Sequence, residues 1–274
     1  MSLTKKIDFA IIISVKNANP NGDPLNGNRP RINYENLGEI SDVCLKRKIR
    51  NRLLDAGESI LVQSDDYRAD EYRSIKDRYD NNEAIKAIAK DKDGEKKAVT
   101  ACEQWFDVRA FGQVLAGVDD TNASIAVRGP VSIQSAFSRE PIDIESLQIV
   151  KSVNLVTNEK DPSKKSSDTM GMKHRVDSGI YVSFGSINRQ LAERTCFSDD
   201  DAEKLKNAML NMFENDESSA RPAGSMEVLK VIWWTHDKKI LPSAKVHKSL
   251  SVENDGSYTL EELDGVSVLE LVAG

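Results

Sequence analysis

Apolar residues follow two different spacings along the chain. Residues 7–16 are rich in β-branched side chains and lie between turn residues, which predicts a buried strand. Similar patterns predict strands at 123–139, where Gly129-Pro130 should bend the chain, and at 147–156, 176–187 and 226–235. Helical spacing predicts helices at 43–56, 103–115 and 198–213, and the second of these places Phe106, Ala110 and Val114 on one stripe.

The order of these elements predicts an α+β fold. Without the intervening segments, strand, helix, strand, strand, helix and strand follow one another, which is typical of a ferredoxin-like or RRM-like sheet. Residues 17–28 contain two Asn-Gly pairs and two prolines, so we expect a loop without helix or strand pairing. Residues 58–97 are polar and predict a peripheral helical insertion. Residues 158–169 are also polar and, with 170–175, predict a long protruding hairpin.

The helix predicted at 43–56 carries an unusual cluster of positive charge. Ser41 or Asp42 should cap it and Gly57 should end it, and its core stripe is Leu45, Ile49, Leu53 and Ala56. Five basic residues lie within seven positions: Lys46, Arg47, Lys48, Arg50 and Arg52. The whole chain has a net charge of −6, so any nucleic-acid surface must be local. Two interpretations stay open: this helix binds phosphates, or it is a solvated face paired with acids elsewhere.

Composition excludes several classes of protein. Hydrophobic residues make up 39% of the 274 positions, which excludes a disordered or collagen-like chain. No apolar run approaches the roughly 18 residues of a membrane-spanning helix, so we expect a soluble, intracellular protein. The three cysteines and three histidines are scattered, and the sequence has neither a Gly-rich phosphate loop nor a zinc-protease motif, so we expect neither metal nor cofactor. The Asp run at 199–201 follows Ser198 and is interpreted as a helix cap.

Seven ordered motifs carry a family resemblance. They are Asn-Pro-Asn-Gly-Asp-Pro at 19–24, Asp-Val-Cys-Leu-Lys-Arg-Lys-Ile-Arg-Asn at 42–51, Phe-Asp-Val-Arg-Ala-Phe-Gly at 106–112, Val-Arg-Gly-Pro at 127–130, Thr-Met-Gly-Met-Lys-His at 169–174, Gly-Ile-Tyr-Val-Ser at 179–183 and Met-Phe-Glu-Asn-Asp at 212–216. In this combination the chain resembles the backbone subunit of the type I-C CRISPR Cascade complex, a member of the RAMP superfamily. The segments 58–97 and 237–274 carry no matching motif.

The resemblance implies a non-catalytic, cytoplasmic prokaryotic protein that polymerises along the CRISPR RNA. Family members have a palm, here about 1–57, 103–157 and 174–236, a fingers insertion at 58–102 and a thumb hairpin with its tip at 158–173. Residues 237–274 would form a C-terminal extension. The guide would be held by its sugar-phosphate backbone without sequence preference and would pair with target DNA. The implied protein partners are further copies of the chain, the processing endoribonuclease, the large subunit and the helicase-nuclease.

The resemblance also assigns roles to residues. Implied RNA contacts are Asn19, Asn21, Gly22, Arg29, Lys46, Arg47, Lys48, Arg50, Arg109, Arg128, Ser132, Gln134, Ser135, Lys173 and His174, with Lys164, Lys165 and Arg175 as further thumb cations. Thr169, Met170 and Met172 would form a wedge that separates stacked bases. For Arg109 the alternative is a buried partner of an acid, and for Met170 and Met172 it is packing on a neighbouring subunit.

Two other functions stay open. The first is a RAMP-type endoribonuclease that cuts RNA with a loop aspartate, for which Asp23 is the candidate. The second is a protein-only scaffold whose basic helix pairs with acids of the next subunit. His174 lies at the base of the predicted hairpin, where a surface role is favoured over a catalytic one.

Overall fold

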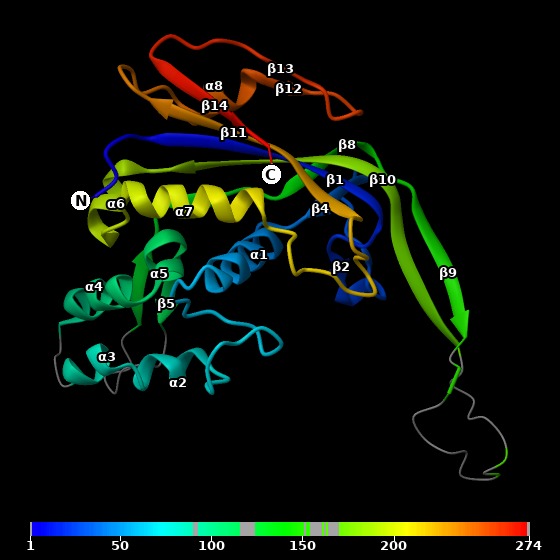
Figure 1. Cartoon of the computed structure of the whole chain (residues 1–274), viewed down its shortest axis with the longest axis horizontal. Helices are drawn as coiled ribbons and strands as arrows, with labels where there is room; N and C mark the ends of the chain where they lie inside the picture. Colours follow the sequence, from blue (N-terminus) through cyan, green and yellow to red (C-terminus); the bar gives the residue numbers. More distant parts are fainter. Residues whose placement is uncertain are drawn as a thin grey trace.

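A large antiparallel sheet forms the centre of the fold (Figure 1). The computed structural model describes residues 2–89, 93–115, 124–150, 152–153, 161, 163 and 170–272. The strand order is β14 (Val266–Leu271), β11 (Met226–His236), β1 (Ile7–Ala18), β10 (Met170–Ile187), β8 (Ala136–Pro141) and β4 (Leu37–Ile40), with β7 (Val131–Ile133) and β9 (Ile144–Val150) also paired to β10. The predicted mixture of helices with a sheet is confirmed.

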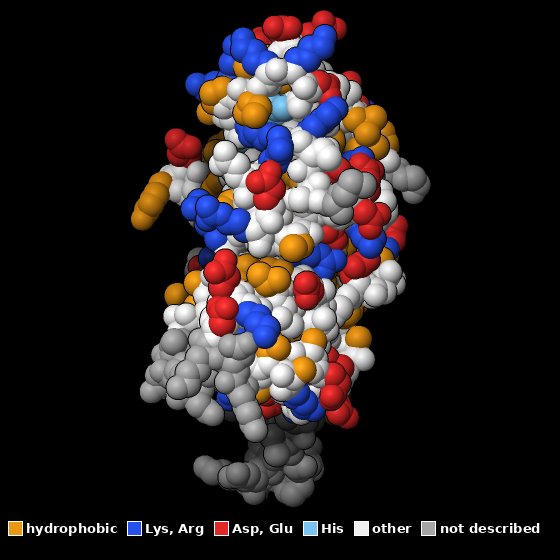
Figure 2. Space-filling model, turned by 90° about the vertical axis from the view of Figure 1, so that its left-hand side faces the viewer, with side chains coloured by type: hydrophobic (Ala, Val, Ile, Leu, Met, Phe, Trp, Pro, Cys, Tyr) orange, Lys and Arg blue, Asp and Glu red, His pale blue; other side chains and the backbone are white. Residues whose placement is uncertain are grey.

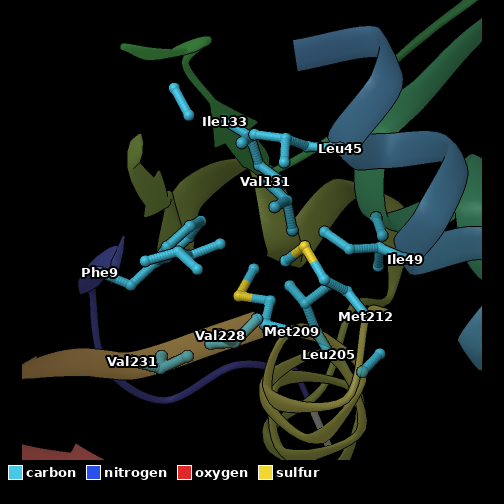
Figure 3. Packing of buried hydrophobic residues seen from close by; sticks show 14 of the residues in the cluster. Phe9, Leu45, Ile49, Val131, Ile133, Leu205, Met209, Met212, Val228 and Val231 are labelled. Carbon is cyan, nitrogen blue, oxygen red and sulfur yellow. The ribbon is translucent and has the colours of Figure 1, made fainter. Parts of the chain in front are cut away.

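Strand β1 is buried on both faces, because layers cover both sides of the sheet. Phe9, Ile11 and Ile13 face helices α1 (Asp42–Asp55) and α7 (Asp199–Leu210). Figure 3 shows this core, in which Leu45 and Ile49 from α1 meet Leu205 and Met209 from α7. The other face of β1 packs against the C-terminal layer, which consists of α8 (Ser243–Lys248), β12 (Leu250–Val252) and β13 (Tyr258–Leu260) (Figure 1).

A helical group with its own small core lies beside α1. It contains α2 (Ile75–Asp80), α3 (Glu83–Ala87), α4 (Gly94–Gln104), α5 (Phe106–Phe111) and the hairpin of β5 (Gly112–Leu115) and β6 (Ile125–Arg128). The rings of Tyr79 and Trp105 stack in that core with centroids 5.7 Å apart. Helix α6 (Arg189–Thr195) joins β10 to α7.

Strands β9 and β10 extend beyond the sheet as a two-stranded ribbon, which we call the arm (Figure 1). In the arm, Met170 lies opposite Val150 and His174 lies opposite Ser146. An isolated hairpin is only marginally stable in water, so the arm depends on contacts at its base or on a partner. The predicted strand at 147–156 is observed as β9, which begins earlier, and its last residues lie largely outside the described part of the chain.

Three local expectations were wrong. Val114 lies on strand β5 and is exposed, because Gly112 with a φ of 78° ends α5 and turns the chain into the strand. Ala56 caps α1 and is exposed, so the core stripe ends at Leu53. The loop at 17–28 contains a short helical turn, η1 (Pro24–Asn26), and a two-residue ladder between β2 (Gly22–Asp23) and β3 (Arg29–Pro30).

Among the described residues, no helix is both long and apolar enough to cross a membrane. The same residues contain no group of three or more His, Cys, Asp and Glu side chains that could hold a metal ion.

Candidate nucleic-acid interface

Helix α1 begins where strand β4 ends, and its N-terminus is fixed by its cap. The Ser41 hydroxyl accepts the N–H of Cys44 at 3.3 Å, as predicted from the sequence. The Cys44 thiol lies 3.8 Å from the carbonyl oxygen of Pro20, which places this face of the helix against the loop that precedes β2. Arg47 follows Cys44 by three positions and therefore lies on the same face.

Lys46 and Arg47 are two of the four partly exposed cations of α1. Lys46 pairs with Asp42 of its own helix at 3.0 Å. Within the part of the chain that the structure describes, Arg47 has no carboxylate in ion-pair contact. Asp66 is near enough for Arg47 to lower its pKa slightly, but the hydrogen bond from Ser64 is the main cause of that shift. Of the cations of α1, Arg47 is therefore the one whose charge no carboxylate of the described chain balances in an ion pair, which leaves it available for a ligand.

Lys48 belongs to the core. Its side chain has no exposed surface, pairs with Asp216 and lies 5.4 Å from the centroid of the Phe213 ring. Burial lowers the pKa of Lys48, and the Asp216 carboxylate opposes part of that shift. Asp216 also accepts a hydrogen bond from Arg221 at 2.8 Å. The structure therefore places this ammonium where a phosphate does not reach it.

Arg50 and Arg52 are also engaged within the protein. Arg50 donates to Asp107 at 2.9 Å, and Asp107 is itself buried and accepts the N–H of Leu61 at 2.8 Å. Arg52 pairs with Asp55 at 2.7 Å and with Glu214 at 2.6 Å. Much of the positive charge that stands out in the sequence is balanced by acids from other segments.

Arg109 is largely buried and pairs with the buried Asp201, which agrees with the alternative raised from the sequence. Its guanidinium lies 2.8 Å from Asp201 and packs 4.8 Å from the centroid of Phe106. Asp201 completes the capping box of α7 with Ser198, so the Asp run is a helix cap as predicted. Burial alone would raise the pKa of Asp201, but the hydrogen bonds from Arg109 and Ser198 hold that pKa below its usual value.

The loop at 19–31 connects α1 to the arm. Asn21 Oδ1 accepts two hydrogen bonds from Ser41, one from the backbone N–H at 2.9 Å and one from the hydroxyl at 2.8 Å. Asn19 is buried and donates to the carbonyl oxygen of Asn28 at 2.7 Å. A side chain at Gly22 would collide with the Asn28 side chain, so the loop packs closely at this glycine. Both asparagine side chains thus hold the loop in place.

The base of the arm contacts the same loop. Arg29 donates to the Ser146 hydroxyl at 2.9 Å, and that hydroxyl lies 2.9 Å from His174 Nδ1. Met172 and Met170 lie two and four positions before His174, on the same face of the ribbon, and are 55% and 66% exposed. Lys173 points to the opposite face and has no acidic partner among the described residues. Thr169, Lys164 and Lys165 lie outside the described residues.

The other expected contacts lie elsewhere. Ser132 sits between Val131 and Ile133, both of which face the α1 side of the sheet, so Ser132 faces the opposite side. Ser135 donates to Glu39 at 2.9 Å, and the Gln134 carbonyl oxygen accepts from Ser183 at 2.7 Å. Arg128 is exposed at the end of β6.

The distribution of charge distinguishes the two ends of the molecule. On the face in Figure 2, which lies away from the arm, acidic and basic side chains are interspersed. On the arm side, Arg29 and His174 meet at Ser146, and Arg47 lies on the helix that the loop at 19–31 contacts; none of the three forms an ion pair with an acid of the described chain. Sequence reasoning missed Ser146 and Arg221, whose roles depend on partners far away in the chain.

Comparison with known proteins gives matches over nearly the whole chain. The sequence profile of the family described as CRISPR-associated protein Cas7 matches residues 5–269. A protein of Haloferax volcanii described as CRISPR-associated protein Cas7 is 25% identical over 240 residues, which cover 82% of this chain and 68% of that protein.

Two solved structures share the fold. A chain of a CRISPR RNA-guided surveillance complex in a pre-nicking state superposes with a TM-score of 0.51 at 14% identity, covering 88% of this chain and 81% of that one. A chain of another CRISPR RNA-guided surveillance complex gives 0.51 at 16% identity, covering 92% and 77%. At these identities the likeness concerns the fold alone.

Proposed function

The chain belongs to the CRISPR-associated protein Cas7 family, and we propose that it is a backbone subunit of a CRISPR surveillance complex that holds the guide RNA by its phosphates. One observation carries this proposal: the loop at 19–31 joins α1 and the arm, and the unbalanced cations Arg29 and Arg47 lie on the elements that it connects. Cations without acidic partners are the groups that gain most from binding a phosphate.

The finer assignment follows the resemblance. We propose a type I-C complex in which copies of the chain polymerise along the CRISPR RNA and present it to target DNA. The large sheet with α1 and α7 would be the palm, residues 58–102 the fingers and the arm the thumb. The further partners would be the processing endoribonuclease, the large subunit and, transiently, the helicase-nuclease. RNA held by phosphates alone would be bound without sequence preference.

The proposal assigns different roles to different residues. Phosphate contacts would come from Arg47, Arg29, Lys173 and His174, with Lys46 after release from Asp42. The exposed Met170 and Met172 would separate bases. Lys48, Arg50 and Arg109 would act indirectly, because their ion pairs fix α1 and α5 against the rest of the protein.

No catalytic step is part of the proposal. In the alternative reading, Asp23 would cut RNA. Its carboxylate instead caps the turn at Pro24–Asn26 by accepting the N–H of Leu25 at 3.1 Å, and it lies 3.7 Å from Arg31. This arrangement favours a structural role for Asp23.

The test is the salt dependence of RNA binding by the full chain. Each phosphate contact contributes about −0.7 to the slope of log affinity against log salt for a single strand. Arg47→Gln should weaken binding and reduce the magnitude of the slope by about 0.7. Arg52→Gln is the matched control, because Arg52 lies on the same helix but is held by Asp55 and Glu214. Equal slopes for wild type and Arg47→Gln, or RNA-free assembly that is insensitive to salt, would contradict the proposal.

A further inference from the structure

A cluster of three side chains at the base of the arm has the composition of an anion site. Arg29 Nη1 and His174 Nδ1 both lie 2.9 Å from the hydroxyl oxygen of Ser146. They come from three separate strands, β3, β10 and β9, so the fold and not a local motif brings them together. Arg29 and His174 are partly exposed and Ser146 is exposed, so a ligand can reach all three.

The hydrogen bonds of this cluster run through the Ser146 hydroxyl. An arginine only donates, so the Ser146 oxygen accepts from Arg29, and the same hydroxyl is hydrogen-bonded to Nδ1 of His174. An anion that bridges Arg29 and His174 favours the charged form of an imidazole, because an opposite charge nearby stabilises the ionised group.

The charged groups around His174 do not supply that anion. On β9, Glu145 points to the other face of the ribbon and pairs with Arg175 at 2.7 Å. On the β2–β3 side, the Asp23 carboxylate accepts the N–H of Leu25 and pairs with Arg31. On β10 itself, Lys173 and Arg175 face away, and Asp177 lies beyond the buried Val176. The described chain thus leaves Arg29 and His174 without a carboxylate partner.

We propose that Arg29, Ser146 and His174 form a proton-linked binding site for one backbone phosphate of the guide RNA. The inference rests on the proposed function and adds a pH dependence of RNA affinity to it. A bound phosphate favours the charged imidazolium of His174, so RNA binding becomes stronger as the pH falls. Histidine changes charge between about pH 8 and about pH 6, a range in which phosphodiesters do not. If the phosphate favours the protonated form by about tenfold, RNA affinity should rise about sixfold across this range.

The experiment measures affinity for a fluorescent oligouridine RNA at both pH values with the full chain. Uracil is neutral at both, so it adds no pH dependence of its own. His174→Gln keeps a hydrogen-bonding side chain but cannot gain charge, so its affinity should change less than twofold. Lys173→Met is the matched control: it removes a cation from the opposite face of the same strand and should keep the sixfold ratio.

The outcomes separate the inference from the proposed function. If wild type and His174→Gln bind RNA with the same ratio between the two pH values, the proton-linked site is refuted while guide binding stands. If the full chain binds no RNA at either pH, both are refuted. Ser146→Ala serves as a second variant, because it removes the bridging hydroxyl without changing charge. It should weaken binding at both pH values and leave a pH ratio above that of His174→Gln.

Discussion

Removing Asp216 should destabilise the protein more than removing its partner Lys48. Asp216→Asn leaves the Lys48 ammonium in a site where its side chain has no exposed surface and where no other carboxylate of the described residues forms an ion pair with it. Lys48→Met leaves Asp216 still paired with Arg221 at 2.8 Å and partly exposed. Methionine also keeps an unbranched side chain beside Phe213. The pair is therefore asymmetric, although each variant loses the same contact.

The magnitudes follow from the two environments. Breaking a buried ion pair so that one charge stays uncompensated costs about 3–5 kcal/mol. The buried lysine can also lose its proton, which from the usual pKa of 10.5 costs about 5 kcal/mol at neutral pH and so limits the penalty. For Lys48→Met, with Asp216 still paired, about 1–2 kcal/mol is expected. The double variant should resemble Lys48→Met, because it contains no buried ammonium.

The pH dependence has a definite sign. A lysine whose pKa is lowered in the folded state binds fewer protons there than in the unfolded chain, so stability rises with pH. Asp216→Asn should therefore recover stability as the pH rises from about 7 toward the unfolded pKa of 10.5. The double variant should lack this recovery.

Urea denaturation of the four proteins at about pH 7 and about pH 9.5 measures these differences. Arg221→Gln is the control, since that side chain is partly exposed and its loss should cost less than about 1 kcal/mol. The reasoning is refuted if Lys48→Met is the less stable single variant, or if Asp216→Asn unfolds like wild type. A double variant no more stable than Asp216→Asn would also refute it.

Two further predictions concern α7 and the arm. Asp201→Asn should cost about 1–2 kcal/mol at neutral pH, as measured by urea unfolding, because Arg109 loses its nearer carboxylate at 2.8 Å and, among the described residues, keeps only Glu58 at 3.8 Å. Because the pKa of Asp201 is lowered in the folded state, its contribution is present above about pH 4 and lost as pH falls below that value, so the two unfolding midpoints should converge in acid. Replacing residues 152–169 by a short turn should leave the sheet folded but prevent RNA-bound filaments, as followed by light scattering; normal filaments would contradict the proposed thumb.

Local signals in the sequence predicted strands β1, β9, β10 and β11 and helices α1 and α7, but not the edge strands β4 and β14 of the sheet. The β-branched run at 7–16 forms β1, and Ser41 and Ser198 cap α1 and α7 as their positions indicate. Each of these signals depends on neighbours within a few positions, which the sequence displays directly. The same β1 run is apolar at every position from Phe9 to Ile13, which indicates cover on both faces, but the segment that supplies the second cover is short and weakly patterned.

The sequence could not show which cations are free. Lys48 meets Asp216 at a separation of 168 residues, Arg109 meets Asp201 at 92 and Arg50 meets Asp107 at 57. No local pattern connects such pairs. The sequence therefore suggests one basic surface on α1, whereas in the structure the basic residues are divided among the core, internal ion pairs and partly exposed positions. The same long-range folding creates the cluster of Arg29, Ser146 and His174, of which only the two basic members stood out in the sequence.

In the proposed function, the loop at 19–31 is the feature that would let an acidic protein hold a polyanion. A helix face with five unbalanced cations would repel itself and attract the acids of its own chain, and α1 has in fact paired most of its cations. Cations drawn singly from different elements avoid this repulsion, but they need a fixed spacing. The two hydrogen bonds from Ser41 to Asn21 and the one from Arg29 to Ser146 provide it, because they tie the N-terminus of α1 and the base of the arm to one loop. The proposed phosphate binding would therefore depend less on the number of basic residues than on how rigidly that loop holds a few of them apart.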